Sequence, residues 1–165
     1  MAYDEGILTD SQMLRSAYGS YGTGVTVVTT VPADGSPVGL TVNSFSSVSL
    51  DPPLVLWCLD KSANSLQIFE QTSHFAINVL AHDQVDLSNT FASSGEDKFS
   101  GLDYTTGAGD APLLAGSVAQ FECESWATYD GGDHIILVGK IVAYRRNNAP
   151  GLLYIGGQYA RSTPA

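Results

Sequence analysis

The stretch VAQFECESWATYDGGDHIILVGKIVAY, residues 118–144, decides the fold class of this protein. Residues 118–128 and 135–144 are the two longest segments of strand character, rich in β-branched and aromatic side chains. Between them, Asp130-Gly131-Gly132-Asp133 is a hairpin turn signal. The stretch therefore predicts a long antiparallel β-hairpin.

Shorter segments on both sides of this hairpin also read as strands, mostly in consecutive antiparallel pairs. Strands are expected at 25–31, 38–42, 54–59, 75–80 and 152–155, and helices at 9–18, from Ser62 onward, and at 84–91. The continuously apolar run at 54–59 predicts a strand buried on both faces. Six or seven strands with two or three helices favour a β-barrel or sandwich with helices outside it.

The length and composition indicate one domain. The chain has 165 residues, of which 44% are hydrophobic and only 15% are charged, enough apolar side chain for a core. We find no repeat and no linker. We expect a single domain over 1–165, with loose termini at 1–8 and 160–165.

The charge balance is strongly acidic, with a formal net charge of −10. Such a surface repels nucleic-acid backbones and anionic membranes, so neither is an expected partner. One lysine or a ring of backbone N–H groups can still hold a small phosphate. The N-terminus lacks signal-peptide character and no apolar run reaches about 18 residues, which predicts a cytoplasmic protein. Cys58 and Cys123 are then expected to be reduced core thiols.

Several common site motifs are missing from the sequence. There is no phosphate-binding P-loop, and the glycines at 19, 22 and 24 have the wrong spacing for a dinucleotide-binding G-x-G-x-x-G. The three histidines, at 74, 82 and 134, have no metal-ligand spacing. We therefore expect neither a Rossmann domain nor a metal site.

Two polar segments are left to carry chemistry. Residues 39–53, GLTVNSFSSVSLDPP, crowd hydroxyls and amides between two apolar strands. They can satisfy their own backbone, or they can bind the edge of a flat heterocycle. Residues 58–65, CLDKSANS, end a strand and open a helix, where Lys61, Ser62 and Ser65 are either a phosphate seat or an ordinary helix cap with an exposed lysine.

Taken together, these segments resemble the short-chain flavin reductase family, the reductase components of two-component flavin monooxygenases. The resemblance covers nearly the whole chain, and the ordered set of motifs is more specific than any one of them. It is carried by residues 24–30 (GVTVVTT), 39–53, 58–65, 75–80 (FAINVL), 87–92 (LSNTFA), 97–101 (DKFSG), 132–134 (GDH) and 153–159 (LYIGGQY). The Gly- and Asp-rich loop 100–110 is less typical of the family.

The resemblance implies an FMN-binding split barrel, a six-stranded antiparallel Greek-key barrel with two or three flanking helices. It implies a homodimer with FMN or FAD near the subunit interface and NADH, or NADPH, as hydride donor. A ring-binding group would comprise Thr41, Asn43, Ser44, Ser47 and Val48, and a phosphate group Cys58, Asp60, Lys61, Ser62 and Ser65. Phe91 and Lys98 would lie near the flavin tail, His134 beside the nicotinamide, and Tyr154 and Tyr159 close to it.

The implied activity is hydride transfer from NADH to flavin, with reduced flavin diffusing to a partner monooxygenase. His134 would position the nicotinamide, because this hydride transfer requires no proton abstraction. Three alternatives stay open: a bound flavin that reduces a corrinoid or a ferric chelate, a non-catalytic flavin-binding protein, and an adaptor that binds no flavin.

Overall fold

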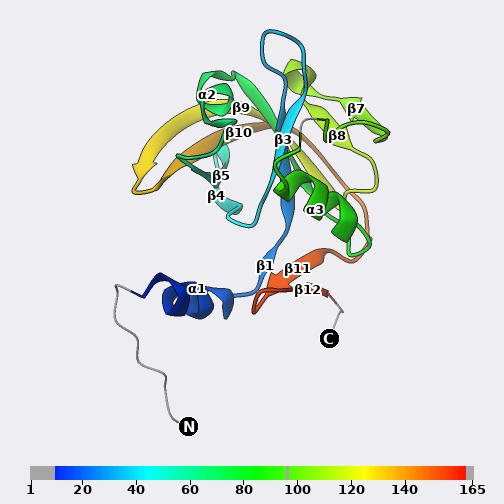
Figure 1. The fold of residues 1–165 in the computed structure, drawn as a ribbon. Helices are drawn as coiled ribbons and strands as arrows, with labels where there is room; N and C mark the ends of the chain where they lie inside the picture. The colour runs from blue at the N-terminus through cyan, green and yellow to red at the C-terminus, as the bar shows by residue number, and fades with distance from the viewer. Residues whose placement is uncertain (1–9, 96, 163–165) are drawn as a thin grey trace.

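A computed structural model describes residues 10–95 and 97–162. Its main sheet has seven strands, each antiparallel to its neighbours. Their order is β3 (Val38–Val42), β2 (Thr26–Thr30), β6 (His74–Val79), β9 (Ala119–Gly131), β10 (His134–Arg146), β5 (Pro53–Asp60) and β4 (Ser46–Leu50). The long hairpin is β9 and β10, which form a curved pair across Figure 1.

The main sheet curls around one core. Val42 of β3 and Trp57 of β5 come from strands near opposite ends of the sheet order, yet both belong to the same buried cluster. Trp57 packs edge-on against Phe69 of α2 (Leu66–Gln71), with ring centroids 5.0 Å apart. The expected mainly β, antiparallel barrel with outer helices is thus confirmed, with seven strands in the main sheet instead of six.

A second core lies beneath α3 (Val85–Ala92). Phe91 of α3 is only 1% exposed and packs edge-on against Phe99. Its ring lies against Gly39 of β3 so closely that a Cβ there would be 2.7 Å from the ring. Glycine at position 39 is therefore what allows α3 to cover the sheet.

Two smaller sheets complete the fold. Three strands pair in the order β1 (Thr23–Gly24), β11 (Leu152–Ile155) and β12 (Gln158–Arg161), and β7 (Tyr104–Thr106) pairs with β8 (Pro112–Leu114). A short 3₁₀ turn, η1, covers Ala108–Asp110. Strand β12 is paired along its length with β11. The expectation of a loose end over residues 160–165 is therefore wrong for residues 160 and 161.

Three other local expectations need correction. Residues 46–50, SSVSL, form the edge strand β4, whose side chains lie mostly at the surface, with even Val48 and Leu50 exposed. In β5, Val55, Trp57 and Leu59 are buried while the residues between them are half-buried, so burial on both faces is wrong. The second helix starts at Leu66 and not near Ser62, because the intervening residues form turns.

The first helix, α1 (Ser11–Gly19), stands apart from the barrel (Figure 1). Asp10 caps it by accepting hydrogen bonds from two backbone N–H groups, whereas the expected cap, Thr9, lies outside the described residues. No residue of α1 is buried. A bond from the Gly156 N–H to the Gly19 carbonyl, 2.7 Å, ties the end of α1 to the β11–β12 turn. None of the described helices is both long and apolar enough to cross a membrane.

Candidate functional site

The two polar segments of the sequence meet at the end of β5. The Ser44 hydroxyl accepts a hydrogen bond from the Cys58 N–H at 2.9 Å and donates one to the Cys58 carbonyl at 3.3 Å. It thereby satisfies backbone groups of Cys58 just beyond the end of the β4–β5 pairing. One of the two interpretations of the serine-rich stretch, that its side chains satisfy backbone groups of the protein itself, therefore applies to Ser44.

The other expected ring-binding residues lie around the same loop. Asn43 and Ser47 are exposed, and Val48 is 49% exposed. The Asn43 and Ser47 side chains form no hydrogen bond with any described residue, so their polar groups face outward. Thr41 is different, because its hydroxyl donates to the Ser88 carbonyl of α3 at 2.7 Å. Thr41 therefore joins β3 to α3.

The turn after β5 is organised by Asp60. Its carboxylate accepts bonds from the Ser62 N–H and the Ser62 hydroxyl, both at 2.7 Å. These two bonds are the main reason that the pKa of Asp60 lies below its usual value. The Ser62 hydroxyl thus bonds to Asp60 and does not cap α2. Ser65 precedes α2, and its side chain forms no capping bond.

Lys61 points to the turn of the β9–β10 hairpin. Its ammonium donates to the Asp130 carboxylate and, at 2.6 Å, to the Gly132 carbonyl. The Lys61 N–H donates to the Asp133 carbonyl at 2.9 Å. The hydrogen bond and charge of Lys61 lower the pKa of Asp130. Residue 61 therefore connects the end of β5 to the hairpin turn.

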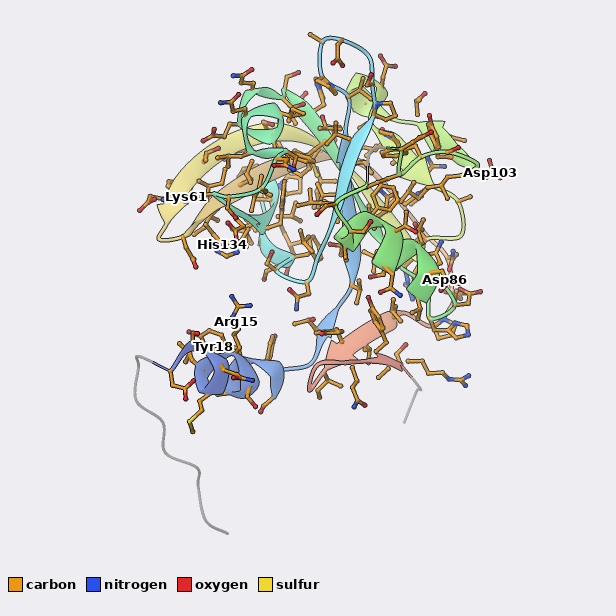
Figure 2. All side chains as sticks on the ribbon, in the orientation of Figure 1. Arg15, Tyr18, Lys61, Asp86, Asp103 and His134 are labelled. Carbon is orange, nitrogen blue, oxygen red and sulfur yellow. The ribbon has the colours of Figure 1, made fainter. Side chains whose placement is uncertain are left out.

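His134 lies in the same place because β10 pairs with β5 in a register that sets His134 opposite Asp60. The ring Nδ1 and the neighbouring Asp133 carboxylate are 2.8 Å apart, and the His134 side chain is 41% exposed. Figure 2 shows Lys61 and His134 at one end of the sheet, with Arg15 of α1 directed toward them. Arg15 contributes to the lowered pKa of Asp60. The sequence analysis did not identify Arg15, because only the placement of α1 brings it here.

The remaining predicted residues gather around α3. Lys98 donates to the Phe91 carbonyl at 3.1 Å, and burial lowers the pKa of its ammonium. The Tyr159 hydroxyl shares a hydrogen bond with the Ser88 hydroxyl and donates to the Asn89 side chain, both at 3.0 Å. Ser88 and Asn89 lie within a motif of the resemblance, but no residue pattern singled them out.

Tyr154 and Tyr159 form an edge-to-face pair with ring centroids 5.4 Å apart. The ring of Phe91, a residue expected near the flavin tail, lies in the core with 1% exposure. The predicted residues thus fall into two groups, one at the end of β5 around His134 and one at α3 around Tyr159.

The two thiols differ in their surroundings. Cys123 is fully buried, and burial raises the pKa of its thiol to about 12. Cys58 is free but only half-buried, beside Ser44. The expectation of two core thiols therefore holds fully for Cys123 alone. Among residues 10–95 and 97–162, no three His, Cys, Asp or Glu side chains are grouped to hold a metal ion.

A cleft of about 340 Å³ lies elsewhere, between the β7–β8 pair and the end of β10. Asp103, which lines it, is on the opposite side of the molecule from His134 in Figure 2. The buried Gln120 amide on its floor already donates to the Asn78 side chain and the Leu114 carbonyl. We therefore assign this cleft no role.

Comparison with known proteins gives a consistent result. Residues 18–163 match the model of the flavin reductase like domain. The chain is 43% identical to an FMN reductase (NADH) of Agrobacterium fabrum, over 92% of this chain and 86% of that protein. It is 46% identical to the reductase component of a flavin-dependent trigonelline monooxygenase of Acinetobacter baylyi, over 92% of this chain but only 48% of that protein. The chain thus spans about half the length of the latter relative.

A solved structure is similar over almost the whole chain. It is the NADH:FAD oxidoreductase of Streptomyces globisporus C-1027 in complex with NAD and FAD fragments. The TM-score is 0.93 at 39% sequence identity, and the alignment covers 98% of each chain.

Proposed function

Because this chain belongs to the flavin reductase-like family, we propose that it transfers a hydride from NADH to FMN or FAD. The observation that carries the proposal is the similarity over 98% of both chains to an oxidoreductase solved with NAD and FAD fragments. A bound flavin supplies the electron acceptor, so the protein has to bind and orient two ring systems and exclude water.

We propose that the loop from β3 to β4 binds the polar edge of the flavin ring. Asn43 and Ser47 are exposed and have side chains that bond to no described residue. Ser44 holds the loop against Cys58 through the bond at 2.9 Å. A serine hydroxyl has one donor and two acceptor positions. Ser44 can therefore go on accepting the hydrogen bond from the Cys58 N–H while its own O–H donates to a ligand. Thr41 and Val48 complete the predicted ring-binding group.

The turn after β5 is our proposed seat for the flavin phosphate. Lys61 supplies the ammonium, and Ser62 and Ser65 supply hydroxyls, with Cys58 and Asp60 on the adjoining strand end. A lysine and hydroxyl donors are common phosphate ligands. Lys98, which donates to the Phe91 carbonyl at the C-terminal end of α3, is the proposed contact for the tail of a larger flavin such as FAD.

His134 is proposed to position the nicotinamide. Its ring lies near the Asp133 carboxylate, and residue 134 pairs with Asp60 where β5 ends. Tyr154 and Tyr159 are proposed as neighbours of the nicotinamide. The hydrogen bonds from Tyr159 to α3 would hold their pair in place.

We also propose a homodimer. Tyr18 of α1 and Trp126, Tyr129 and Tyr144 of the long hairpin are between 54% and 75% exposed. Aromatic side chains on this scale are typical of surfaces covered by a partner. Light scattering of the purified protein tests this: a dimer mass supports it, and a monomer at micromolar concentration contradicts it.

The partner enzyme is proposed to be a flavin-dependent monooxygenase that receives reduced flavin by diffusion. The support is that the Acinetobacter relative is named as the reductase component of such an enzyme. A stable contact between the two proteins is not needed for this exchange.

The decisive experiment follows NADH absorbance with purified protein, with and without added FMN, FAD or riboflavin. Turnover that requires added flavin supports a reductase of diffusible flavin. Flavin binding without turnover would instead favour a bound flavin that reduces another acceptor, such as a corrinoid or a ferric chelate. Absence of both binding and turnover would contradict the proposal.

A further inference from the structure

The ammonium of Lys61 already has an anionic partner within the protein. It donates to the Asp130 carboxylate and to the Gly132 carbonyl, both in the turn of the β9–β10 hairpin. If Lys61 binds a flavin phosphate, the phosphate has to take the place of Asp130 or share the ammonium with it. The strength of phosphate binding then depends on Asp130 as well as on Lys61.

Two other carboxylates lie next to Lys61, but each is already held by another group. Asp60 accepts both hydrogen bonds of Ser62. Asp133 lies 2.8 Å from the His134 ring. Of these three carboxylates, only that of Asp130 accepts a hydrogen bond from the Lys61 ammonium.

The pairing between Lys61 and Asp130 is also easily exchanged. The Lys61 side chain is 41% exposed and the Asp130 side chain 78% exposed. Ion pairs this open to water contribute little to stability and compete readily with other ions. A phosphate monoester carries up to two negative charges, so it is attracted to the ammonium and repelled by the neighbouring carboxylates.

We propose that Asp130 sets how strongly the site prefers a phosphorylated flavin, FMN or FAD, over riboflavin, because Asp130 competes with the phosphate for Lys61. This inference rests on the proposed function. It makes Asp130 a specificity-determining residue that acts through Lys61. It also explains how a very acidic turn can adjoin a phosphate seat, because the competing charge moderates the affinity for the phosphate.

The test is the ratio of the dissociation constants of riboflavin and FMN, measured by flavin fluorescence at low ionic strength. Asp130→Asn keeps the shape of the side chain and removes its charge. We expect it to tighten FMN binding about three- to tenfold, the scale of an exposed charge acting on a dianion. Riboflavin binding should change less than about twofold, because riboflavin carries no phosphate.

Asp103→Asn is the matched control, because it removes the same charge on the far side of the molecule (Figure 2). An equal gain in FMN affinity from Asp103→Asn would show a general charge effect and overturn the inference. An unchanged or smaller ratio in Asp130→Asn would also overturn it. Lys61→Met should lower the ratio, since the phosphate loses its ammonium, and an unchanged ratio there would contradict the mechanism.

The outcome also separates this inference from the proposed function. Wild-type protein that binds neither flavin would overturn both. Wild-type protein that oxidises NADH with riboflavin, together with an unaltered ratio in Asp130→Asn, would overturn the role of Asp130 and leave the reductase function standing.

Discussion

Replacing Ser44 by alanine tests whether the β3–β4 loop is held by one hydroxyl. That hydroxyl accepts the Cys58 N–H at 2.9 Å and lies 3.3 Å from the Cys58 carbonyl. Ser44→Ala leaves a half-buried backbone N–H without its partner. Losing the partner of a buried donor costs about 1–3 kcal/mol. Cys58 is only half-buried, and water can reach part of it. We therefore expect Ser44→Ala to lower the free energy of unfolding by about 1–2 kcal/mol.

The assay is urea unfolding followed by tryptophan fluorescence, since Trp57 lies on the same strand as Cys58. With a slope of about 2 kcal/mol per molar urea, the midpoint of Ser44→Ala should fall by about 0.5–1 M. Ser47→Ala is the matched control, because it removes an exposed hydroxyl that bonds to no described residue. Its midpoint should move by less than about 0.3 M. An unchanged midpoint in Ser44→Ala, or an equal loss in Ser47→Ala, would refute the reasoning.

Three further predictions follow from other parts of the molecule. His134→Ala should slow flavin reduction by NADH about tenfold, through loss of positioning, while flavin affinity stays within about twofold. Stopped-flow rates and a flavin titration measure these, and loss of flavin binding would contradict the assignment. Gly39→Ala should lower the free energy of unfolding by about 1–3 kcal/mol, because its Cβ would lie 2.7 Å from the Phe91 ring. The measurement is the melting temperature of each variant. Gly24→Ala, where a Cβ meets no atom within 4 Å, is the control, and its melting temperature should stay close to that of the wild type. Asp60 has a lowered pKa in the folded state, so its stabilising effect is present above the unfolded value of 3.8 and is lost as pH falls through the lower folded value. Asp60→Asn should therefore flatten the acid side of a urea-midpoint series, and an equally steep series would argue against this effect.

Much of the fold could be predicted because its signals are local. β-Branched runs and a Gly-Gly turn predicted the pairing of β9 with β10, and β3 occupies the residues expected for it. The strand β4 was missed for a physical reason. It is short and rich in serine, and it lies at the edge of the sheet with its side chains mostly at the surface, so its sequence resembled a polar loop.

The candidate site was predicted less completely. The resemblance identified His134, Lys61 and the serine-rich loop, and the structure brings these together at the end of β5. Phe91 was expected near a ligand, but the close approach of α3 to Gly39 buries it. Arg15 could not be identified, because its position depends on where α1 lies relative to the barrel.

The sequence by itself determined the strand-forming segments, the main hairpin turn and the residue types able to bind a flavin. Periodicity and turn chemistry act over a few residues, so these features can be recognised directly in the sequence. Only the tertiary structure decided which polar side chains meet. Lys61 and Asp130 are 69 residues apart, and Ser88 and Tyr159 are 71 apart. Such pairings depend on the register of the curled sheet and on the docking of α3, because two distant side chains come together only once the sheet has curled around its core.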